Sequence, residues 1–194
     1  MSALPGGHEY DAEVVALVTS PGHSYWHHSR DPADGVGPHA TLTHDAVEIV
    51  AEQGIVGDRF FGKVSQLTSA VSFVAAEAVE EVARELGSAP FDPALMRRNV
   101  VTRGIDLNAL RRHRFELRQG DAVLRFEADG ETSPCAWMDW ALAPGARDLL
   151  RGRGGLRANP LTSGVLRVGP VVLVAQFGMD AARAGQRVRR GRLP

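Results

Sequence analysis

Residues 115–127 read Phe-Glu-Leu-Arg-Gln-Gly-Asp-Ala-Val-Leu-Arg-Phe-Glu. Two runs rich in apolar residues, 115–117 and 122–127, flank a short polar connection at 118–121. Glycine readily adopts the positive φ angle that a tight hairpin turn requires, and Gly120 lies in this connection. The segment therefore predicts two antiparallel strands joined by a tight turn.

Similar short apolar runs, punctuated by glycine, recur in both directions from this hairpin. They predict further strands at 13–19, 47–51, 71–74, 99–103 and 171–175. Residues 161–169 predict a second hairpin. Many short strands with frequent glycine are typical of a closed or nearly closed β-barrel. We therefore expect a mainly β fold of this kind, with a few α-helices at its periphery.

Helical patterns are fewer than strand patterns. Residues 75–86 repeat apolar side chains at helical spacing, and Gly87 follows as a C-terminal stop. Asp92-Pro93 offers a cap and a first-turn proline for a shorter helix, and residues 143–151 predict a third. No long linker divides the 194 residues. We expect a single domain over 1–194, with its core at about 13–176 and a basic tail at 183–194.

The composition is that of an ordinary globular protein, with 44% apolar and 23% charged residues. Residues 1–11 show no basic region followed by an apolar run, and no apolar stretch is long enough to span a membrane. With one cysteine as well, we expect a cytoplasmic protein without a membrane partner. The tail at 183–194 holds five arginines and no acid. No nucleic-acid-binding signature accompanies it, so we interpret it as a solvated terminus; nucleic-acid binding is the alternative.

Cys135 is the only cysteine in the chain. Ser133 is a good helix N-cap and Pro134 a natural first helical residue, which predicts that Cys135 lies in the first turn of a short helix. Backbone N–H groups and the helix dipole would then favour a thiolate, which attacks electrophiles or ligates a soft metal. The alternative is a buried, inert cysteine, and the neighbouring Trp137 and Met138 suit that interpretation equally well. The local sequence leaves both open.

Several other segments carry groups that could bind a ligand. Glycines surround Asp58-Arg59 in residues 54–62, and this pair is either a structural ion pair or a guanidinium offered to a phosphate. Arg97, Arg98 and Asn99 offer donors without a negative charge, which suits an anion, and a solvated surface group is the equally good alternative. The flexible, basic segment 151–157 could fold over an anion or be only a loop. Zinc binding is not expected, because the spacing of four histidines matches no ligand motif; they are His23, His27, His28 and His39.

Taken in chain order, these segments resemble the MOSC domain, the family named for the C-terminal part of molybdenum-cofactor sulfurase. The most specific match is 97–107, Arg-Arg-Asn-Val-Val-Thr-Arg-Gly-Ile-Asp-Leu. The resemblance runs from about residue 13 to 174, and its other parts are the turn at 20–24 (Ser-Pro-Gly-His-Ser), 54–58 (Gly-Ile-Val-Gly-Asp), 73–79, the hairpin 115–127, Pro134-Cys135 and 154–164. It implies a distorted barrel and the handling of molybdenum cofactor or of sulfur destined for it.

In cofactor-binding relatives the cysteine ligates molybdenum, and an Arg-x-Asn motif and a serine two residues before the cysteine line the same site. The resemblance places these roles on Cys135, Arg97, Asn99 and Ser133, and we add Arg59 as a further cofactor-binding candidate. It also implies either reduction of N-hydroxylated compounds or sulfur transfer. Since no flavin, haem or iron–sulfur motif is present, an external redox or sulfur-donor protein would be needed. The alternative is a non-catalytic module that binds an anionic ligand on the same barrel.

The chain departs from the family pattern at three places. Phe60 or Phe61 stands where many relatives have a histidine, and Thr132 stands where some have a second cysteine. Residues 25–28 replace a lysine found in some relatives. Larger relatives also carry an N-terminal β-barrel module, or a desulfurase domain that binds pyridoxal phosphate. We expect this chain to have room for neither.

Overall fold

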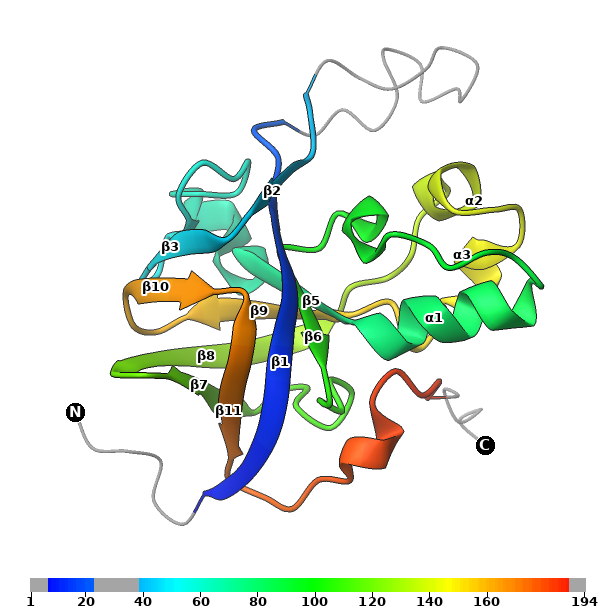
Figure 1. Cartoon of the computed structure of the whole chain (residues 1–194). Coiled ribbons are helices and arrows are strands. Elements are labelled where there is room, and N and C mark those ends of the chain that lie inside the picture. The colour runs from blue at the N-terminus through cyan, green and yellow to red at the C-terminus, as the bar shows by residue number, and fades with distance from the viewer. Residues whose placement is uncertain (1–6, 23–38, 189–194) are drawn as a thin grey trace, which may run out of the picture.

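The computed structural model describes residues 7–22 and 39–188 (Figure 1). Its strands are β1 (His8–Thr19), β2 (Leu42–His44), β3 (Ala46–Val50), β4 (Gly54–Ile55), β5 (Val71–Ala75), β6 (Val100–Arg103), β7 (Arg114–Gln119), β8 (Ala122–Glu131), β9 (Leu156–Pro160), β10 (Gly164–Arg167) and β11 (Gly169–Ala175). The helices are α1 (Ala76–Glu85), α2 (Trp137–Ala141) and α3 (Ala146–Leu149), with short 3-10 turns η2 (Val64–Ser69), η3 (Pro93–Met96) and η4 (Ala181–Arg183).

Seven strands form a closed barrel in the order β11-β7-β8-β9-β5-β6-β1. The barrel closes because β1 pairs antiparallel with β11, from His8 opposite Ala175 to Val14 opposite Gly169. β5 and β6 are parallel, and β2 extends the sheet beyond β1. The predicted mainly β fold with a closed barrel and peripheral helices is confirmed, and β1 begins earlier than the strand predicted at 13–19.

The two predicted hairpins have different outcomes. The hairpin at 115–127 is confirmed, since β7 pairs with β8 and Gly120 turns with a φ of 57°. The hairpin at 161–169 is wrong, because β10 pairs with β3 in a separate three-stranded sheet, β10-β3-β4. The Ser163 hydroxyl accepts a hydrogen bond from the Ala51 amide at 2.9 Å, which fixes the chain beside β3 before β10 begins. β10 therefore pairs with β3, which is far away in the sequence, whereas the local pattern predicted a partner within residues 161–169.

Successive side chains of a strand point to opposite faces of the sheet, so the apolar core has one layer inside the barrel and one outside it. Phe73, Phe115 and Phe126 point into the barrel, where their ring centroids lie 5.2–5.6 Å apart. Val74, the next residue of β5, points outward and packs against α1, α2 and α3 in a second apolar cluster. The predicted helix at 75–86 is confirmed as α1, which buries the face that carries Val79 and Val82. Figure 1 shows these helices together on one side of the barrel.

The C-terminal segment is docked on the domain as far as Val188. Gly185 has a φ of 70° and passes so close to α1 that a Cβ atom there would lie 2.4 Å from the Ala78 nitrogen. The Val188 amide donates to the Gly152 carbonyl at 3.1 Å. The expectation of a solvated tail is therefore wrong for residues 183–188, because backbone and side-chain hydrogen bonds hold them; 189–194 lie outside the described residues. Within the described ranges, no helix has the length and apolar character needed to cross a membrane.

Candidate functional site

Four segments that are far apart in the sequence meet in one buried polar group, which we call the Arg97 cluster. It consists of Ser20 at the end of β1, Asp58 in the loop after β4, Ser72 in β5, and Arg97 and Asn99 between η3 and β6. All five residues are buried. Burying polar groups is costly unless they are hydrogen-bonded, so the cluster must be closely paired.

Asp58 is the anchor of the cluster. Its Oδ2 atom accepts hydrogen bonds from the Ser20 amide at 3.2 Å and from Nδ2 of Asn99 at 3.1 Å, and its Oδ1 atom accepts from the Phe60 amide at 3.1 Å. The guanidinium of Arg59 approaches Oδ2 at 3.5 Å and lies 4.7 Å from the centre of the Phe60 ring. The Asp58-Arg59 pair is thus a buried ion pair at the edge of the cluster.

Both the oxygen and the nitrogen of the Asn99 side-chain amide form hydrogen bonds. Oδ1 accepts from the Ser72 amide at 3.0 Å and from the Ser72 hydroxyl at 2.8 Å. Nδ2 donates to the Val18 carbonyl at 3.1 Å and to Asp58. An asparagine side chain offers two donor hydrogens and one acceptor oxygen with two lone pairs, and all are used here. Asn99 therefore links β1, β5 and the Asp58 loop.

Arg97 connects the cluster to the cysteine segment. It has a φ of 53°, an uncommon conformation for a residue other than glycine. Its guanidinium donates to the Ser20 hydroxyl at 2.7 Å and to the Gly22 carbonyl at 3.2 Å. On its other side it lies 5.7 Å from the ring centre of Trp137, a cation–π contact. The indole of Trp137 is fixed in turn by donating to the Leu95 carbonyl at 2.9 Å.

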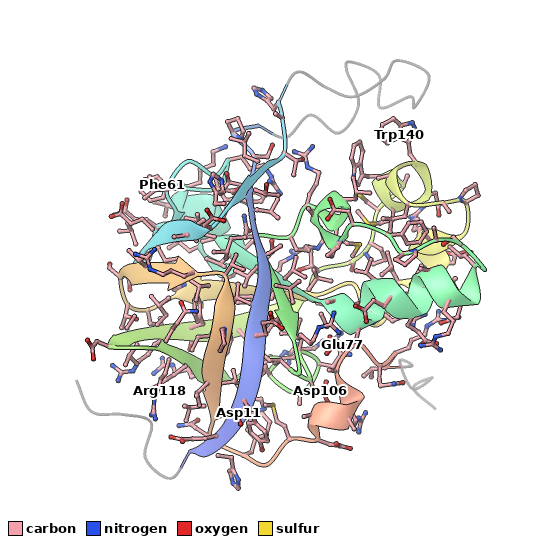
Figure 2. The ribbon with its side chains drawn as sticks, viewed as in Figure 1. Asp11, Phe61, Glu77, Asp106, Arg118 and Trp140 are labelled. Atoms are coloured by element: carbon pink, nitrogen blue, oxygen red, sulfur yellow. The ribbon has the colours of Figure 1, made fainter. Side chains whose placement is uncertain are left out.

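Cys135 lies two residues before Trp137 and is half-buried against the second apolar cluster. The prediction that Ser133 caps a helix with Cys135 in its first turn is wrong: α2 begins at Trp137, and no side chain caps it. The reason is that Thr132 donates to the Gly155 carbonyl at 2.9 Å, which holds this segment against β9. The helix-dipole argument for a thiolate therefore does not apply. Trp140 projects from α2 at the surface, with its ring 4.8 Å from that of Trp137 (Figure 2).

Among the described residues, no hydrogen bond joins Ser133 to the Arg97 cluster. Ser133 is exposed and lines a pocket of about 740 Å³, which we call the arginine pocket because four of its other lining residues are Arg111, Arg147, Arg151 and Arg187. The structure thus brings together Arg59, Arg97 and Asn99 around Asp58 and Ser20, and it places Trp137 against Arg97. Cys135 precedes Trp137 by two residues, and Ser133 lines the arginine pocket.

Two features of the site escaped the sequence prediction. Ser20 and Asp58 lie within recognised motifs but carried no site role, although together they fix Arg97 and Asn99. Trp137 was assigned only to the apolar surroundings of the cysteine. Its spacing two residues after Cys135 was the available signal, but its contact with Arg97 depends on the fold. Of the four histidines that were considered as zinc ligands, His23, His27 and His28 lie outside the described residues.

Metal binding by the protein alone has no support in the part of the chain that the structure describes. No group of three or more histidine, cysteine, aspartate or glutamate side chains gathers there. His39 is described and packs on Gly22 next to the Arg97 cluster. The only cysteine has no cysteine partner.

Comparison with known structures gives the same fold. The YuaD protein from Bacillus subtilis has a TM-score of 0.67 at 18% identity, and the match covers 89% of this chain and all of that one. YiiM from Geobacillus stearothermophilus has a TM-score of 0.57 at 15% identity, covering 84% of this chain and 74% of that one. YiiM from Escherichia coli has a TM-score of 0.53 at 17% identity, covering 88% and 75%. At these identities the likeness establishes the fold alone.

No curated protein sequence matches the chain. The sequence model of the MOSC domain matches residues 33–173, which is well over half of the chain. That range contains Asp58, Arg97, Asn99 and Cys135, the residues around which the site is built. The protein belongs to the MOSC domain family.

Proposed function

We propose that this protein binds molybdenum cofactor, or carries sulfur destined for it, through the thiol of Cys135. One observation carries the proposal: the Arg97 cluster joins three distant motifs and presents a buried guanidinium to Trp137, two residues beyond the cysteine. A buried cation held next to the segment that carries the cysteine offers positive charge to an anionic ligand bound there.

The residues present fit such a cofactor in its donor chemistry. Because no cluster of three metal-ligating side chains is found among the described residues, a bound metal would have to arrive with most of its own ligands. Molybdenum cofactor would meet this requirement, because its pterin would carry the metal, and the Cys135 thiolate would be a suitable soft donor from the protein. When bound, it would supply two-electron redox chemistry at the metal.

The protein's own residues have separate tasks in this proposal. Cys135 supplies the sulfur, and Arg97 supplies positive charge for the phosphate or oxo groups of the cofactor. Asn99 has no hydrogen-bonding capacity left, so we assign it to positioning Arg97 rather than to contacting a ligand. Arg59 has a buried Nε atom with no hydrogen-bond partner among the described residues, and it remains a candidate for contact with the ligand. Ser133 belongs to the arginine pocket.

The sulfur-carrying form of the proposal needs only the cysteine and a donor protein. The Cys135 thiolate would attack the outer sulfur of a donor persulfide, forming the S–S bond of a Cys135 persulfide while the S–S bond of the donor breaks. The donor leaves as a thiolate, so charge and sulfur atoms balance. A cofactor-dependent reductase would need an external electron donor instead.

A second candidate is a module on the same barrel that binds an anionic ligand without turnover. The packing of half-buried Cys135 against the second apolar cluster favours it, because a cysteine packed among apolar side chains is less reactive than an exposed one. The two candidates differ in whether the thiol is needed for ligand retention.

Molybdenum content and pterin fluorescence of freshly purified protein separate these candidates. Wild-type protein and Ala136→Ser, a matched control that adds a hydroxyl to the exposed neighbour, should retain metal and pterin or accept a persulfide. Cys135→Ser should lose both while keeping the melting temperature within a few degrees. If Cys135→Ser retains the pterin, or if the native thiol resists alkylation and its replacement unfolds the protein, the second candidate is correct.

A further inference from the structure

The arginine pocket is formed where the end of β8, the region of α3 and the docked C-terminal segment meet. Its lining contains four arginines and one carboxylate, that of Glu131. Glu131 is already engaged: it accepts a hydrogen bond from the Gly152 amide at 2.8 Å and pairs with Arg111 at 3.5 Å. The pocket therefore has a clear excess of positive charge.

That charge is only partly compensated by neighbouring carboxylates. Arg151 pairs with Asp148 at 3.0 Å, as Arg111 does with Glu131. Within the described part of the chain, neither Arg147 nor Arg187 has a carboxylate at ion-pair distance. Four guanidinium groups around one hollow repel one another, and an anion in that hollow would relieve the repulsion.

The pocket is also held in place before any ligand arrives. Arg187 donates from Nε to the Arg151 carbonyl at 2.9 Å and from NH2 to the Asp148 carbonyl at 3.1 Å. These bonds fix its position and leave its charge unneutralised. Arg111 is fixed by Asn108 and Glu131, while its buried Nε has no hydrogen-bond partner among the described residues. Preorganised donors lose little entropy when they bind.

We propose that the arginine pocket binds a small organic phosphate, that is, a phosphate monoester or a diphosphate. Guanidinium groups match phosphate oxygens with paired hydrogen bonds, and several of them together suit a group that carries more than one negative charge. The volume of about 740 Å³ falls in the range of small-molecule sites, so it leaves room for the organic part of the ligand.

This site goes beyond the function proposed above, because it shares no residue with the Arg97 cluster and does not need the Cys135 thiol. It lies beside the same segment, since Ser133 and Pro134 line the pocket and directly precede the cysteine. The docked C-terminal segment supplies one wall through Arg187 and Val188. The segment first interpreted as a solvated tail is thus part of a binding site.

Titration calorimetry with inorganic pyrophosphate tests the proposal on the full-length protein. Arg147→Gln and Arg187→Gln should each weaken binding roughly tenfold, the loss expected for one charge-assisted hydrogen bond. Arg114→Gln is the matched control: it removes one arginine charge on β7, outside the pocket, and should leave the affinity within about twofold. Cys135→Ser should bind pyrophosphate as wild type does, which separates this site from the proposed cofactor site.

Arg147 is exposed, and its side chain forms no hydrogen bond among the described residues, so Arg147→Gln should fold even if Arg187→Gln does not. Equal affinity in wild type and Arg147→Gln would overturn the proposal, as would an equal loss in Arg114→Gln. It also fails if duplex DNA binds through these arginines while pyrophosphate does not. If a chain ending at Val188 no longer binds pyrophosphate, the binding belongs to the terminal arginines rather than to the pocket.

Discussion

Replacing Asn99 with alanine should destabilise the barrel severely. The change removes four side-chain hydrogen bonds, two with Ser72, one with Val18 and one with Asp58. At about 1 kcal/mol for each bond, the free energy of unfolding should fall by roughly 4 kcal/mol. The buried Ser72 amide keeps no side-chain acceptor, so the loss should not be smaller than this estimate. Domains of this size are stable by only about 5–15 kcal/mol, so the variant would be close to unfolding.

Urea unfolding followed by tryptophan fluorescence measures this loss from the shift of the midpoint at constant slope. Asn159→Ala is the matched control, because Asn159 is also an asparagine in a barrel strand, but its buried Oδ1 has no hydrogen-bond partner among the described residues. It should cost less than about 1 kcal/mol. If Asn99→Ala costs as little as the control and yet abolishes pterin retention, Asn99 contacts the ligand directly, and its assignment to positioning Arg97 is wrong.

Three further predictions concern the core, the C-terminal segment and an exposed ion pair. Phe126→Ala should cost about 3–5 kcal/mol in the same urea assay, since Phe126 is fully buried between Phe73 and Phe115; a cost below 1 kcal/mol would contradict the packing. Gly185→Ala should lower the melting temperature and increase proteolysis after Ala184, whereas Gly120→Ala, at a similar φ in open space, should show only the smaller strain of its turn. Arg103 donates hydrogen bonds to Glu80 and lowers the pKa of that carboxyl, so the pair stabilises the protein above the ordinary glutamate pKa and loses this contribution as the pH falls through the lowered value. Glu80→Gln should therefore cost at most about 1 kcal/mol at pH 7 and nothing in strong acid; an unchanged cost across that range would refute the assignment.

The β7–β8 hairpin could be predicted because the sequence information that specifies it is local. The alternation in β7 and β8, with Gly120 between them, specifies a hairpin whatever surrounds it. The pairing of β10 with β3 could not be predicted, because more than 100 residues separate the partners and several short strands fit the same apolar pattern. Strand partners at long range depend on packing that a local sequence pattern does not contain.

In the site too, features set by neighbouring residues could be predicted, and features set by distant residues could not. Asp92 caps η3 as predicted, because its carboxylate accepts from the Ala94 amide only two residues away. Ser133 does not cap a helix, because contacts with the chain around Gly155 override its local preference. The motifs identified Arg97 and Asn99, but only the fold shows that Asn99 is saturated by Ser72, Val18 and Asp58. Residue type indicates what a side chain can bind, and its neighbours decide whether it is available.

Native mass spectrometry of the freshly purified protein tests the role of Cys135 most directly, because one spectrum resolves both a bound pterin cofactor and a persulfide. We predict that wild-type protein carries one of these additions, that Ala136→Ser carries the same one, and that Cys135→Ser carries neither while remaining folded. A wild-type protein that acquires neither addition when supplied with the cofactor or with a persulfide donor would contradict the account, and so would the same addition on Cys135→Ser.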